Sequence, residues 1–392
     1  MQKSFDGNGE ITDHHAASDV AQRGVTRRAV LRTGFLAAGA LMAQRLFGQS
    51  AGGAPPGALV IRNARPLDAE ASIVTLRDAV TATDAFFVRS HFGPPTDWPV
   101  AWQLVIDGEV ETPLTLTLRD LHAAARVART VTLECAGNGR ALFALPSSSG
   151  VQWERGAVST AIWTGVPLRT LLQRAGVKAS AQHLWMEAMD RAPLPNTPRF
   201  LRSIPRALAD ADALVAYEMN GAPIPLLHGG PVRLIVPGWF GMASTKWLTH
   251  VHARTTESDN HFMARGYRYA DGSAVTTMRT KSVITMPLSG DRLPAGRVTV
   301  RGQAWTSIES GGIRGVEVSA DGGATWTPGT LLGDAHAGAW RGWEAAVTLA
   351  RGAATLLARA TDNTGGVQPM QATANAGGYG NNSIHQVPVH VG

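Results

Sequence analysis

The order of apolar and polar positions between residues 58 and 286 predicts short strands mixed with short helices. Trp102–Ile106 alternates and runs into the turn signal Asp107-Gly108, as a strand ending in a tight turn does. Pro167–Ala175 has helical spacing, with proline at its first turn and Gly176 just past its end. The pattern predicts a further strand at Thr130–Glu134 and further helices at Arg119–Ala125 and Pro205–Leu214. Because helices and strands alternate irregularly, we expect an α+β domain and not a simple doubly wound sheet.

After Pro287 the pattern becomes β-rich. Turn sequences such as Asp321-Gly322-Gly323 separate short alternating segments, and the predicted strands are Val298–Ala304, Gly315–Ser319, Trp343–Leu349 and Thr355–Thr361. Strands at this spacing are typical of a β-sandwich of the immunoglobulin type. A chain of 392 residues with 44% apolar residues can form two domains with buried cores. We place the boundary between residues 58–286 and 287–392, without a long linker or an internal repeat.

The first 57 residues are predicted to be an export leader and linker. Thr26-Arg27-Arg28 precedes a short apolar run over residues 33–43, which is the twin-arginine pattern, and this run is too short to span a bilayer. A loose Gly/Ala/Pro segment follows it at Gly48–Gly57. The alternative is an ordinary amphipathic surface helix. The twin-arginine route carries folded proteins, so we expect a periplasmic protein that folds around a cofactor, with no transmembrane segment in the mature chain.

Charge and cysteine content limit the partners and the chemistry. Lys and Arg exceed Asp and Glu by 36 − 30 = 6, without a polybasic block, so a nucleic-acid partner has little support while anionic small molecules remain open. Cys135 is the single cysteine, which excludes an internal disulfide and a thiolate zinc cluster. A lone cysteine is commonly an inert buried residue. Any chemistry at Cys135 therefore uses one thiol.

The surroundings of Cys135 favour a chemical role over an inert one. Cys135 follows a predicted strand and opens a turn with two glycines, which presents its sulfur where a bulky ligand can approach the backbone. Arg140 follows five residues later and would favour the thiolate and attract an anion. The spacing alone does not name the ligand.

Several segments, in order, resemble the sulfite oxidase family of molybdenum-pterin enzymes. Besides the cysteine loop they are Phe86–His91, Gly156–Leu168, Ala216–Gly221, His228–Arg233, Val236–Gly238 and Ser244–Leu248. The resemblance extends from about residue 80 to the C-terminus. It implies a sulfite-oxidase-type molybdopterin domain followed by a β-sandwich that forms a homodimer.

The resemblance also implies roles for individual residues. Cys135 would be the one protein ligand to molybdenum, which suits a soft sulfur donor. The pterin and its phosphate would be held by Phe87, Arg89, His91, Asp190, His228, Arg233, Ser244, Thr245 and Lys246. The substrate pocket would be lined by Arg89, Arg140, Trp153 and Tyr267. Taken singly, each has an ordinary alternative as a surface cation, a loop histidine or a core aromatic.

The chain departs from the family pattern near its C-terminus. Animal and plant members carry an arginine that completes a three-arginine sulfite pocket, and the corresponding stretch Asn375–His385 contains none. Losing one cation weakens the binding of a dianion, so a related sulfur compound is an alternative to sulfite. Arg265 and Arg268, beside Tyr267, are candidates to supply the missing charge.

The implied activity is oxidation of sulfite, or of a related sulfur compound, by oxygen-atom transfer at molybdenum-molybdopterin. The sequence has no Cys-x-x-Cys-His motif, and the leader runs almost directly into the catalytic region, so we expect no heme. Electrons would then pass to an external acceptor such as cytochrome c, with molecular oxygen as the alternative. A sulfoxide reductase of the same superfamily is a second hypothesis, although that branch generally lacks the C-terminal β-domain. A secreted binding module with an inactive pocket is a third, and intact Cys135, Arg140 and Lys246 argue against it.

Overall fold

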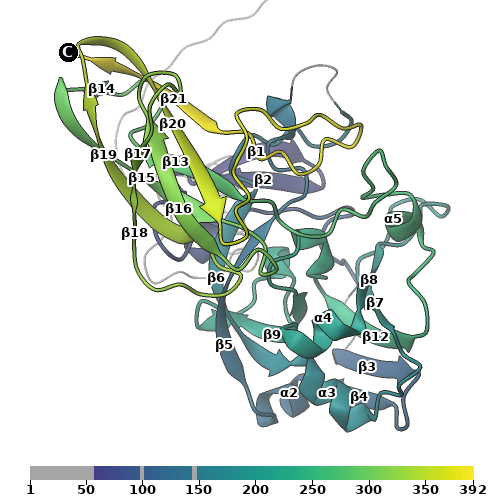
Figure 1. Ribbon diagram of the computed structural model, residues 1–392. Helices are drawn as coiled ribbons and strands as arrows, with labels where there is room; N and C mark the ends of the chain where they lie inside the picture. Colours follow the sequence, from purple (N-terminus) through teal and green to yellow (C-terminus); the bar gives the residue numbers. More distant parts are fainter. Residues whose placement is uncertain (1–56, 98–100, 144–147) are drawn as a thin grey trace, which may run out of the picture. The chain divides into compact units, whose positions relative to one another are not determined.

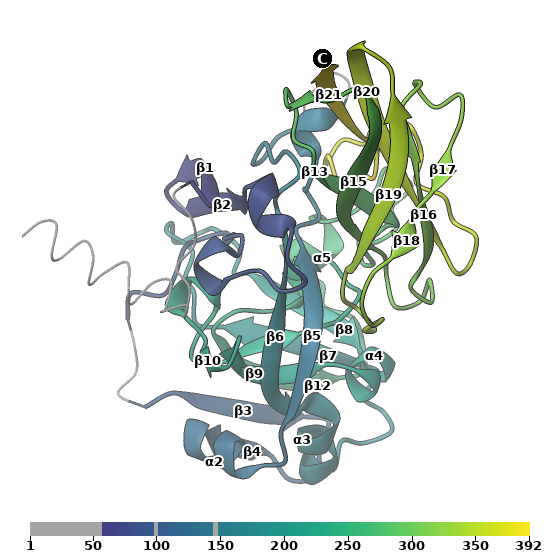
Figure 2. The same cartoon turned by 90° about the vertical axis from the view of Figure 1, so that its left-hand side faces the viewer.

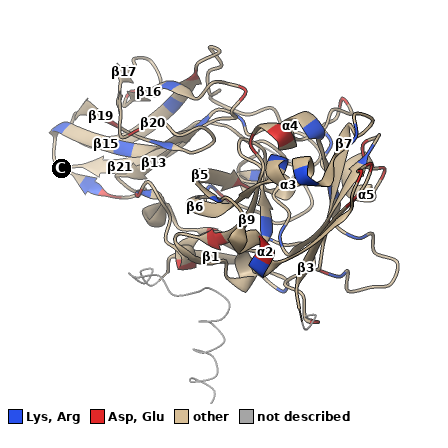
Figure 3. Ribbon diagram, turned by 90° about the horizontal axis from the view of Figure 1, so that it is seen from below, with Lys and Arg blue, Asp and Glu red and all other residues tan. Residues whose placement is uncertain are grey.

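The computed structural model describes residues 57–97, 101–143 and 148–392 (Figure 1). The expected twin-arginine leader and its apolar run lie outside these ranges. Within them, no helix combines the length and apolar character needed to cross a membrane. Lys and Arg are interspersed with Asp and Glu along the described ribbon (Figure 3).

A first sheet leads the chain to Cys135. Its strand order is β10-β9-β6-β5, with β11 paired to β9, and all pairs are antiparallel. The strands are β5 (Val127–Glu134), β6 (Val158–Pro167), β9 (Leu214–Met219), β10 (Ala222–Pro223) and β11 (Arg233–Ile235). The long strands β5 and β6 lie side by side in Figure 2. Since β5 ends at Glu134, this sheet places Cys135 at the start of a turn, as predicted.

A second sheet has the order β4-β3-β12-β7-β8, in which β12 and β3 are parallel. Its strands are β3 (Gln103–Gly108), β4 (Leu114–Thr117), β7 (His183–Ala188), β8 (Leu201–Pro205) and β12 (Leu248–Arg254). The short helices are α2 (Leu118–Ala123), α3 (Leu168–Ala175), α4 (Arg206–Ala211) and α5 (His261–Ala264). Apolar residues of this sheet and of α2, α3 and α4 form one buried core.

The three predicted helices are present, each shorter than its predicted range, and α2 begins one residue earlier than predicted. Helix α3 starts after Pro167 and ends at Ala175, and it is capped by Gly176, whose φ of +65° is a conformation that glycine adopts without strain. Strands nevertheless dominate this part of the chain. A separate hairpin, β1 (Leu59–Ala64) and β2 (Leu67–Ala71), precedes it. The single-turn 3-10 helices are η1 (Ile73–Leu76), η2 (Thr83–Ala85), η3 (Arg140–Leu142), η4 (Leu226–His228) and η5 (Gly241–Ala243).

The C-terminal region consists of two sheets that pack around a common core. One has the order β13-β15-β19-β18 and the other β14-β21-β20-β16-β17. Their bounds are β13 (Lys281–Met286), β14 (Arg292–Leu293), β15 (Gly296–Trp305), β16 (Ile313–Ser319), β17 (Thr327–Pro328), β18 (Thr330–Leu331), β19 (Arg341–Leu349), β20 (Gly352–Asp362) and β21 (His385–Val391). Buried residues such as Val300, Trp343 and Leu356 join the two sheets. Strand β13 precedes residue 287 but pairs with β15, so the sheet pairing places it in this sandwich.

The sandwich contacts the cysteine loop directly. Glu134 is 1% exposed, and one carboxylate oxygen accepts from Lys281 Nζ at 2.6 Å and from Asn138 Nδ2 at 2.9 Å. Its other oxygen accepts from Trp305 Nε1 at 2.9 Å. Asn381 Nδ2 donates to the Gly139 carbonyl at 3.0 Å. These contacts anchor both ends of the turn that carries Cys135, and we call Glu134, Lys281, Asn138 and Trp305 the Glu134 network.

Candidate functional site

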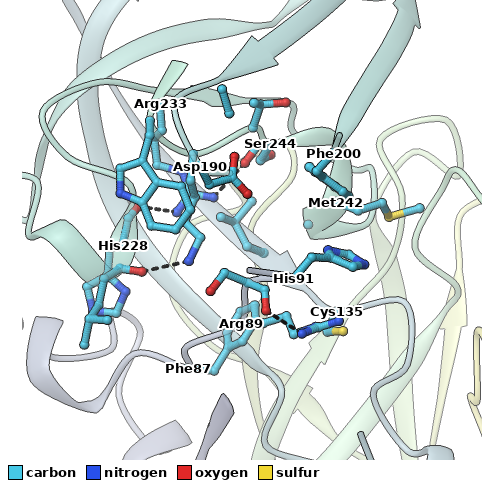
Figure 4. Close-up of a pocket in the computed structure, with 18 of the residues that line it drawn as sticks. Phe87, Arg89, His91, Cys135, Asp190, Phe200, His228, Arg233, Met242 and Ser244 are labelled. Atoms are coloured by element: carbon cyan, nitrogen blue, oxygen red, sulfur yellow. Dashed lines mark hydrogen bonds between the residues drawn. The ribbon is translucent and has the colours of Figure 1, made fainter. Parts of the chain in front are cut away.

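One cavity collects segments that are far apart in the sequence. It lies among the turn after β5, the segment that follows η2, η4 with β11, the residues from Gly241 to Trp247, and Tyr267. The predicted site residues that line it are Phe87, Arg89, His91, Cys135, Asp190, His228, Arg233, Ser244, Thr245, Lys246 and Tyr267. Figure 4 shows Cys135 beside Arg89, with His228 and Arg233 on the other side of the view.

The thiol end of the cavity is held by backbone hydrogen bonds. Cys135 N donates to the Ala157 carbonyl at 2.9 Å, and the Cys135 carbonyl accepts from Asn138 N at 2.9 Å. Burial raises the pKa of the Cys135 thiol, while Arg89 and Arg140 oppose this rise. Arg89 in turn pairs with the buried Asp68, with 3.2 Å between Nη1 and Oδ1. The thiol therefore has a fixed position and cations nearby, and a soft metal ion would favour its ionised form.

The other end of the cavity holds two cations, Arg233 and Lys246. Arg233 is 5% exposed, and its Nη atoms donate to the carbonyls of His228 at 2.7 Å and Ser244 at 2.9 Å. Lys246 Nζ donates to the Leu227 carbonyl at 2.8 Å. Within the described ranges, neither forms an ion pair with a carboxylate.

The pKa values of these groups follow from the same burial. It lowers the pKa of Arg233 to about 9 and, with Arg233 adding repulsion, that of Lys246 to about 7. It also lowers the pKa of His228 to about 3, so this ring is neutral, and its Nε2 donates to the Thr83 carbonyl at 2.9 Å. Burial raises the pKa of the Asp190 carboxyl to about 6.

Unsatisfied polar atoms indicate what this end of the cavity binds. Arg233 Nε and Thr245 Oγ1 are buried and have no hydrogen-bond partner among the described residues. Buried cations and orphaned polar atoms are unfavourable unless a ligand satisfies them. A phosphate would accept from all of them. A phosphate group at this end and a soft metal at Cys135 match the two ends of a molybdenum-pterin cofactor, so the residues present fit that group.

Tyr267 and His91 line the wall near the thiol. Tyr267 Oη lies 3.2 Å from His91 Nε2, and the His91 ring stacks on Phe200 with centroids 4.6 Å apart. Burial holds the pKa of His91 well below its ordinary value, and Arg89, Arg202 and Lys246 add to this effect. Burial also raises the pKa of Tyr267. At neutral pH the imidazole is therefore neutral and the phenol keeps its proton.

Two predicted pocket residues do not line this cavity. Arg140 donates to the Gly377 carbonyl through Nε at 3.2 Å and Nη2 at 3.1 Å, and to the Val151 carbonyl through Nη1 at 2.9 Å. Trp153 is 0% exposed and packs in an apolar cluster that Cys135 also contacts, although its indole Nε1 has no partner among the described residues. The carbonyl of Gly377, in the 375–385 loop, and the carbonyl of Val151 thus engage Arg140.

The structure adds residues that the sequence did not single out. Phe200 and Met242 line the cavity, and Arg202 lies behind Tyr267. No motif or periodicity marks residues 191–202, so the sequence carries no signal for Phe200 or Arg202. The two expected substitutes for the missing arginine are elsewhere: Arg265 is exposed and Arg268 pairs with Glu257 at 3.3 Å, and neither lines the cavity.

Comparison with known proteins identifies the family. Two family models match: the oxidoreductase molybdopterin binding domain over residues 91–262 and the Mo-co oxidoreductase dimerisation domain over residues 272–392. Sulfite oxidase of Gallus gallus is 35% identical over 337 residues, which cover 79% of this chain and 73% of that protein. The chain belongs to the sulfite oxidase family of molybdenum oxidoreductases.

Two other proteins are similar to this chain over most of its length. Human mitochondrial sulfite oxidase is 34% identical over 362 residues, 85% of this chain and 66% of the human protein, so the chain spans just under two thirds of that relative. The crystal structure of the sulfane dehydrogenase SoxCD from Paracoccus pantotrophus superposes with a TM-score of 0.72 at 27% identity, covering 96% of this chain and 92% of that one. The resemblance seen in the sequence motifs is therefore confirmed at the level of the family and of its two-domain fold.

The unpaired cations make a prediction for the protein without cofactor. Replacing Lys246 with Met should increase the free energy of unfolding of the cofactor-free protein, because burial disfavours the ammonium form and no described carboxylate forms an ion pair with it. Between pH 7 and 10.5 the unfolded chain carries a proton on Lys246 that the folded chain does not, so wild-type stability should rise with pH across this window. Lys246→Met should lose this slope and, in a host that makes the cofactor, retain less pterin. Urea unfolding at pH 7.5 and 9.5 measures how the free energy of unfolding changes with pH. Lys178→Met, at an exposed lysine, is the control. The same change with pH in wild type, Lys246→Met and Lys178→Met would contradict the prediction.

Proposed function

We propose that this protein is an exported molybdenum enzyme that oxidises sulfite, or a related sulfur compound, by oxygen-atom transfer. The observation that supports it most is the cavity itself, with one thiol at one end and unpaired buried cations at the other, in a chain of the sulfite oxidase family. Bound molybdenum-molybdopterin would supply the two-electron redox chemistry and the transferable oxygen. The protein would bind, orient and stabilise charge.

The cofactor would be held at both ends of the cavity. Arg233, Lys246 and Thr245 have the free donors that a phosphate requires, and His228 and Ser244 hold Arg233 in place through their carbonyls. Cys135 would ligate the metal through its thiolate. Asp190 lies near Lys246 and lines the same cavity, where its carboxyl can accept hydrogen bonds from the pterin.

The substrate would bind on the side of Arg89, His91 and Tyr267. A positive guanidinium reduces the cost of bringing an anion into a partly desolvated site. Tyr267 keeps its proton at neutral pH and can donate it in a hydrogen bond to a substrate oxygen. Neutral His91, 3.2 Å from the phenol oxygen, orients that hydroxyl group.

A second candidate substrate is a sulfane sulfur compound. The loop Asn375–His385 carries no arginine and presents Tyr379, whose ring stacks on Tyr267 with centroids 5.2 Å apart. An aromatic wall in place of a cation favours a less highly charged substrate. The similar SoxCD is named a sulfane dehydrogenase, which supports testing this class beside sulfite.

Three further features belong to this proposal. Export by the twin-arginine route to the periplasm rests on the arginine pair at residues 27–28. An external acceptor such as cytochrome c would take the electrons. The C-terminal sandwich, of the expected immunoglobulin type, would form a homodimer, in agreement with the dimerisation-domain match. Light scattering at micromolar concentration distinguishes this dimer from a monomer.

The deciding experiment combines metal analysis with a steady-state assay. Protein purified from a host that makes the cofactor is expected to contain close to one molybdenum per chain and to reduce cytochrome c with sulfite. Less than about a tenth of a molybdenum per chain would contradict the enzyme assignment. Full molybdenum loading without sulfite turnover, but with turnover of thiosulfate or a persulfide, would move the substrate to the sulfane class.

A further inference from the structure

Arg202 is a buried cation with incomplete hydrogen bonding. It lies in β8, is 2% exposed, and donates through Nη1 to the Phe262 carbonyl. Its Nε is buried and has no partner, and within the described part of the chain no carboxylate forms an ion pair with it. Glu257, which contributes to its electrostatics, already pairs with Arg268 at 3.3 Å. Burial lowers the pKa of Arg202 to about 10, so the group remains charged at neutral pH.

The charge of Arg202 lies one aromatic ring away from the cavity. Its guanidinium carbon is 5.1 Å from the centroid of the Tyr267 ring, and Tyr267 lines the cavity. Phe200, two residues earlier, lines the same cavity and stacks on His91. Residues two apart in extended chain point to the same side, so Arg202 faces the side on which the cavity lies. Arg202 also lowers the pKa of His91, consistent with this proximity.

A stack of side chains, in which two arginines flank two tyrosines, connects Arg202 with the C-terminal loop. Tyr267 contacts Tyr379 with ring planes 25° apart, and the guanidinium carbon of Arg140 is 5.5 Å from the centroid of the Tyr379 ring. We call Arg202, Tyr267, Tyr379 and Arg140 the arginine–tyrosine stack. Cation–π contacts of this kind stabilise both partners, more so when they are desolvated. The loop that lacks an arginine therefore fixes the Tyr267 ring against a cation that comes from β8.

The other cations near this wall are already engaged. Arg89 pairs with Asp68 at 3.2 Å, and Arg140 donates to the carbonyls of Gly377 and Val151. Arg202 has one carbonyl acceptor and a free Nε. In a site of low dielectric constant, an uncompensated charge acts on an incoming anion across several ångströms. Of these three guanidinium groups, Arg202 has the fewest partners among the described residues, so its charge is the least compensated.

We propose that Arg202 supplies the positive charge that stabilises an oxyanion substrate at the Tyr267 wall, acting across the Tyr267 ring that Tyr379 holds in place. The proposal rests on the proposed function, because it assigns the substrate end of the same cavity. Arg202 is then a specificity-determining residue for anionic sulfur substrates, and the arginine–tyrosine stack takes the place of a charged side chain from the 375–385 loop.

The test compares a neutral and a charged replacement in the molybdenum-loaded protein. Arg202→Gln keeps a donor for the Phe262 carbonyl and removes the charge, Arg202→Met is a second neutral variant, and Arg202→Lys keeps the charge. Arg265→Gln removes an exposed cation from the same region as the matched control. Two quantities are measured: the dissociation constant of sulfate by calorimetry, and KM and kcat for sulfite. Molybdenum content and thermal unfolding are recorded for every variant.

We expect the neutral variants to weaken sulfate binding and raise KM by roughly 10- to 100-fold, while kcat changes by less than about threefold. Arg202→Lys should stay within about threefold of wild type, and Arg265→Gln within about twofold. The inference is overturned if the molybdenum-loaded and folded Arg202→Gln variant binds sulfate as tightly as wild type. It is also overturned if kcat alone falls, because Arg202 would then only shape the pocket. Wild-type protein that binds no sulfate at 10 mM also overturns it. A further outcome separates the two proposals. If the molybdenum-loaded wild type does not oxidise sulfite, but Arg202→Gln still weakens sulfate binding, the proposed substrate is refuted and the inference about Arg202 stands.

Discussion

Replacing Cys135 with Ser is expected to lower the turnover number at least about 1000-fold, because a hydroxyl group is a poor substitute for a thiolate as ligand to a soft metal. The side chains differ little in size, and the turn around residue 135 is held by backbone hydrogen bonds to Ala157 and Asn138. We therefore expect the free energy of unfolding to change by about 1 kcal/mol or less. Steady-state assay and urea unfolding of the same preparation separate the two effects.

The Cys135→Ser variant should also retain pterin. Arg233, Lys246 and Thr245 hold the phosphate end in our proposal, and none of them depends on the thiol. Lys246→Met provides the converse case, with the thiol intact and the phosphate end weakened. Pterin released by denaturation and measured by fluorescence distinguishes the variants. Turnover by Cys135→Ser at more than about a tenth of the wild-type rate would refute the ligand assignment.

Breaking the Glu134 network should be the most destabilising single change outside the apolar cores. Lys281→Met leaves a carboxylate that is 1% exposed and has, among the described residues, the two neutral side-chain donors Asn138 and Trp305. Removal of one partner from a buried ion pair costs about 3–5 kcal/mol, because the remaining charge keeps its desolvation penalty. Urea unfolding followed by tryptophan fluorescence measures the loss. Because Glu134 precedes Cys135, we also expect the molybdenum content to fall.

A double-mutant cycle isolates the pair from general damage. Glu134→Gln combined with Lys281→Met removes both charges, and we expect it to be less destabilising than the sum of the single variants by about 2 kcal/mol. The exposed pair Arg301–Glu344, 3.0 Å apart in the same sandwich, is the matched control, and Arg301→Met should cost about 1 kcal/mol or less. Equal effects of Lys281→Met and Arg301→Met would show that the Glu134 network does not hold the cysteine loop.

The Glu134 network also connects the C-terminal sandwich with the part of the cavity wall that carries Cys135. Lys281 and Trp305 belong to β13 and β15, whereas Glu134 and Asn138 flank Cys135 in the sequence. Together with the contact of Asn381 to the Gly139 carbonyl, they make the C-terminal region part of the support of Cys135. A change at the sandwich can therefore alter the position of the thiol without touching the cavity wall.

Local chemistry made much of the fold predictable. Pro167 and Gly176 act within one helical turn of the ends of α3, and the alternating pattern of Val298–Ala304 reflects the two faces of one strand. The site residues in motifs were predictable for a similar reason, since the cysteine loop and the Ser244–Lys246 segment are each continuous in sequence. The pattern was less informative for the balance of helix and strand, because short helices of six to eight residues depend on tertiary packing.

By itself, the sequence determined the family, the single thiol and the absence of an arginine between residues 375 and 385. Only the tertiary structure decided which cations face the cavity. Arg140, expected in the pocket, donates to a carbonyl 237 positions away, while Arg202, which no motif marks, lies against Tyr267. Propensities and turn geometry act over a few residues, whereas the partner of a buried charge is chosen by packing between distant segments. The absence of an arginine from residues 375–385 could therefore be seen in the sequence. The position of Arg202, which we propose takes its place, could not be predicted from it.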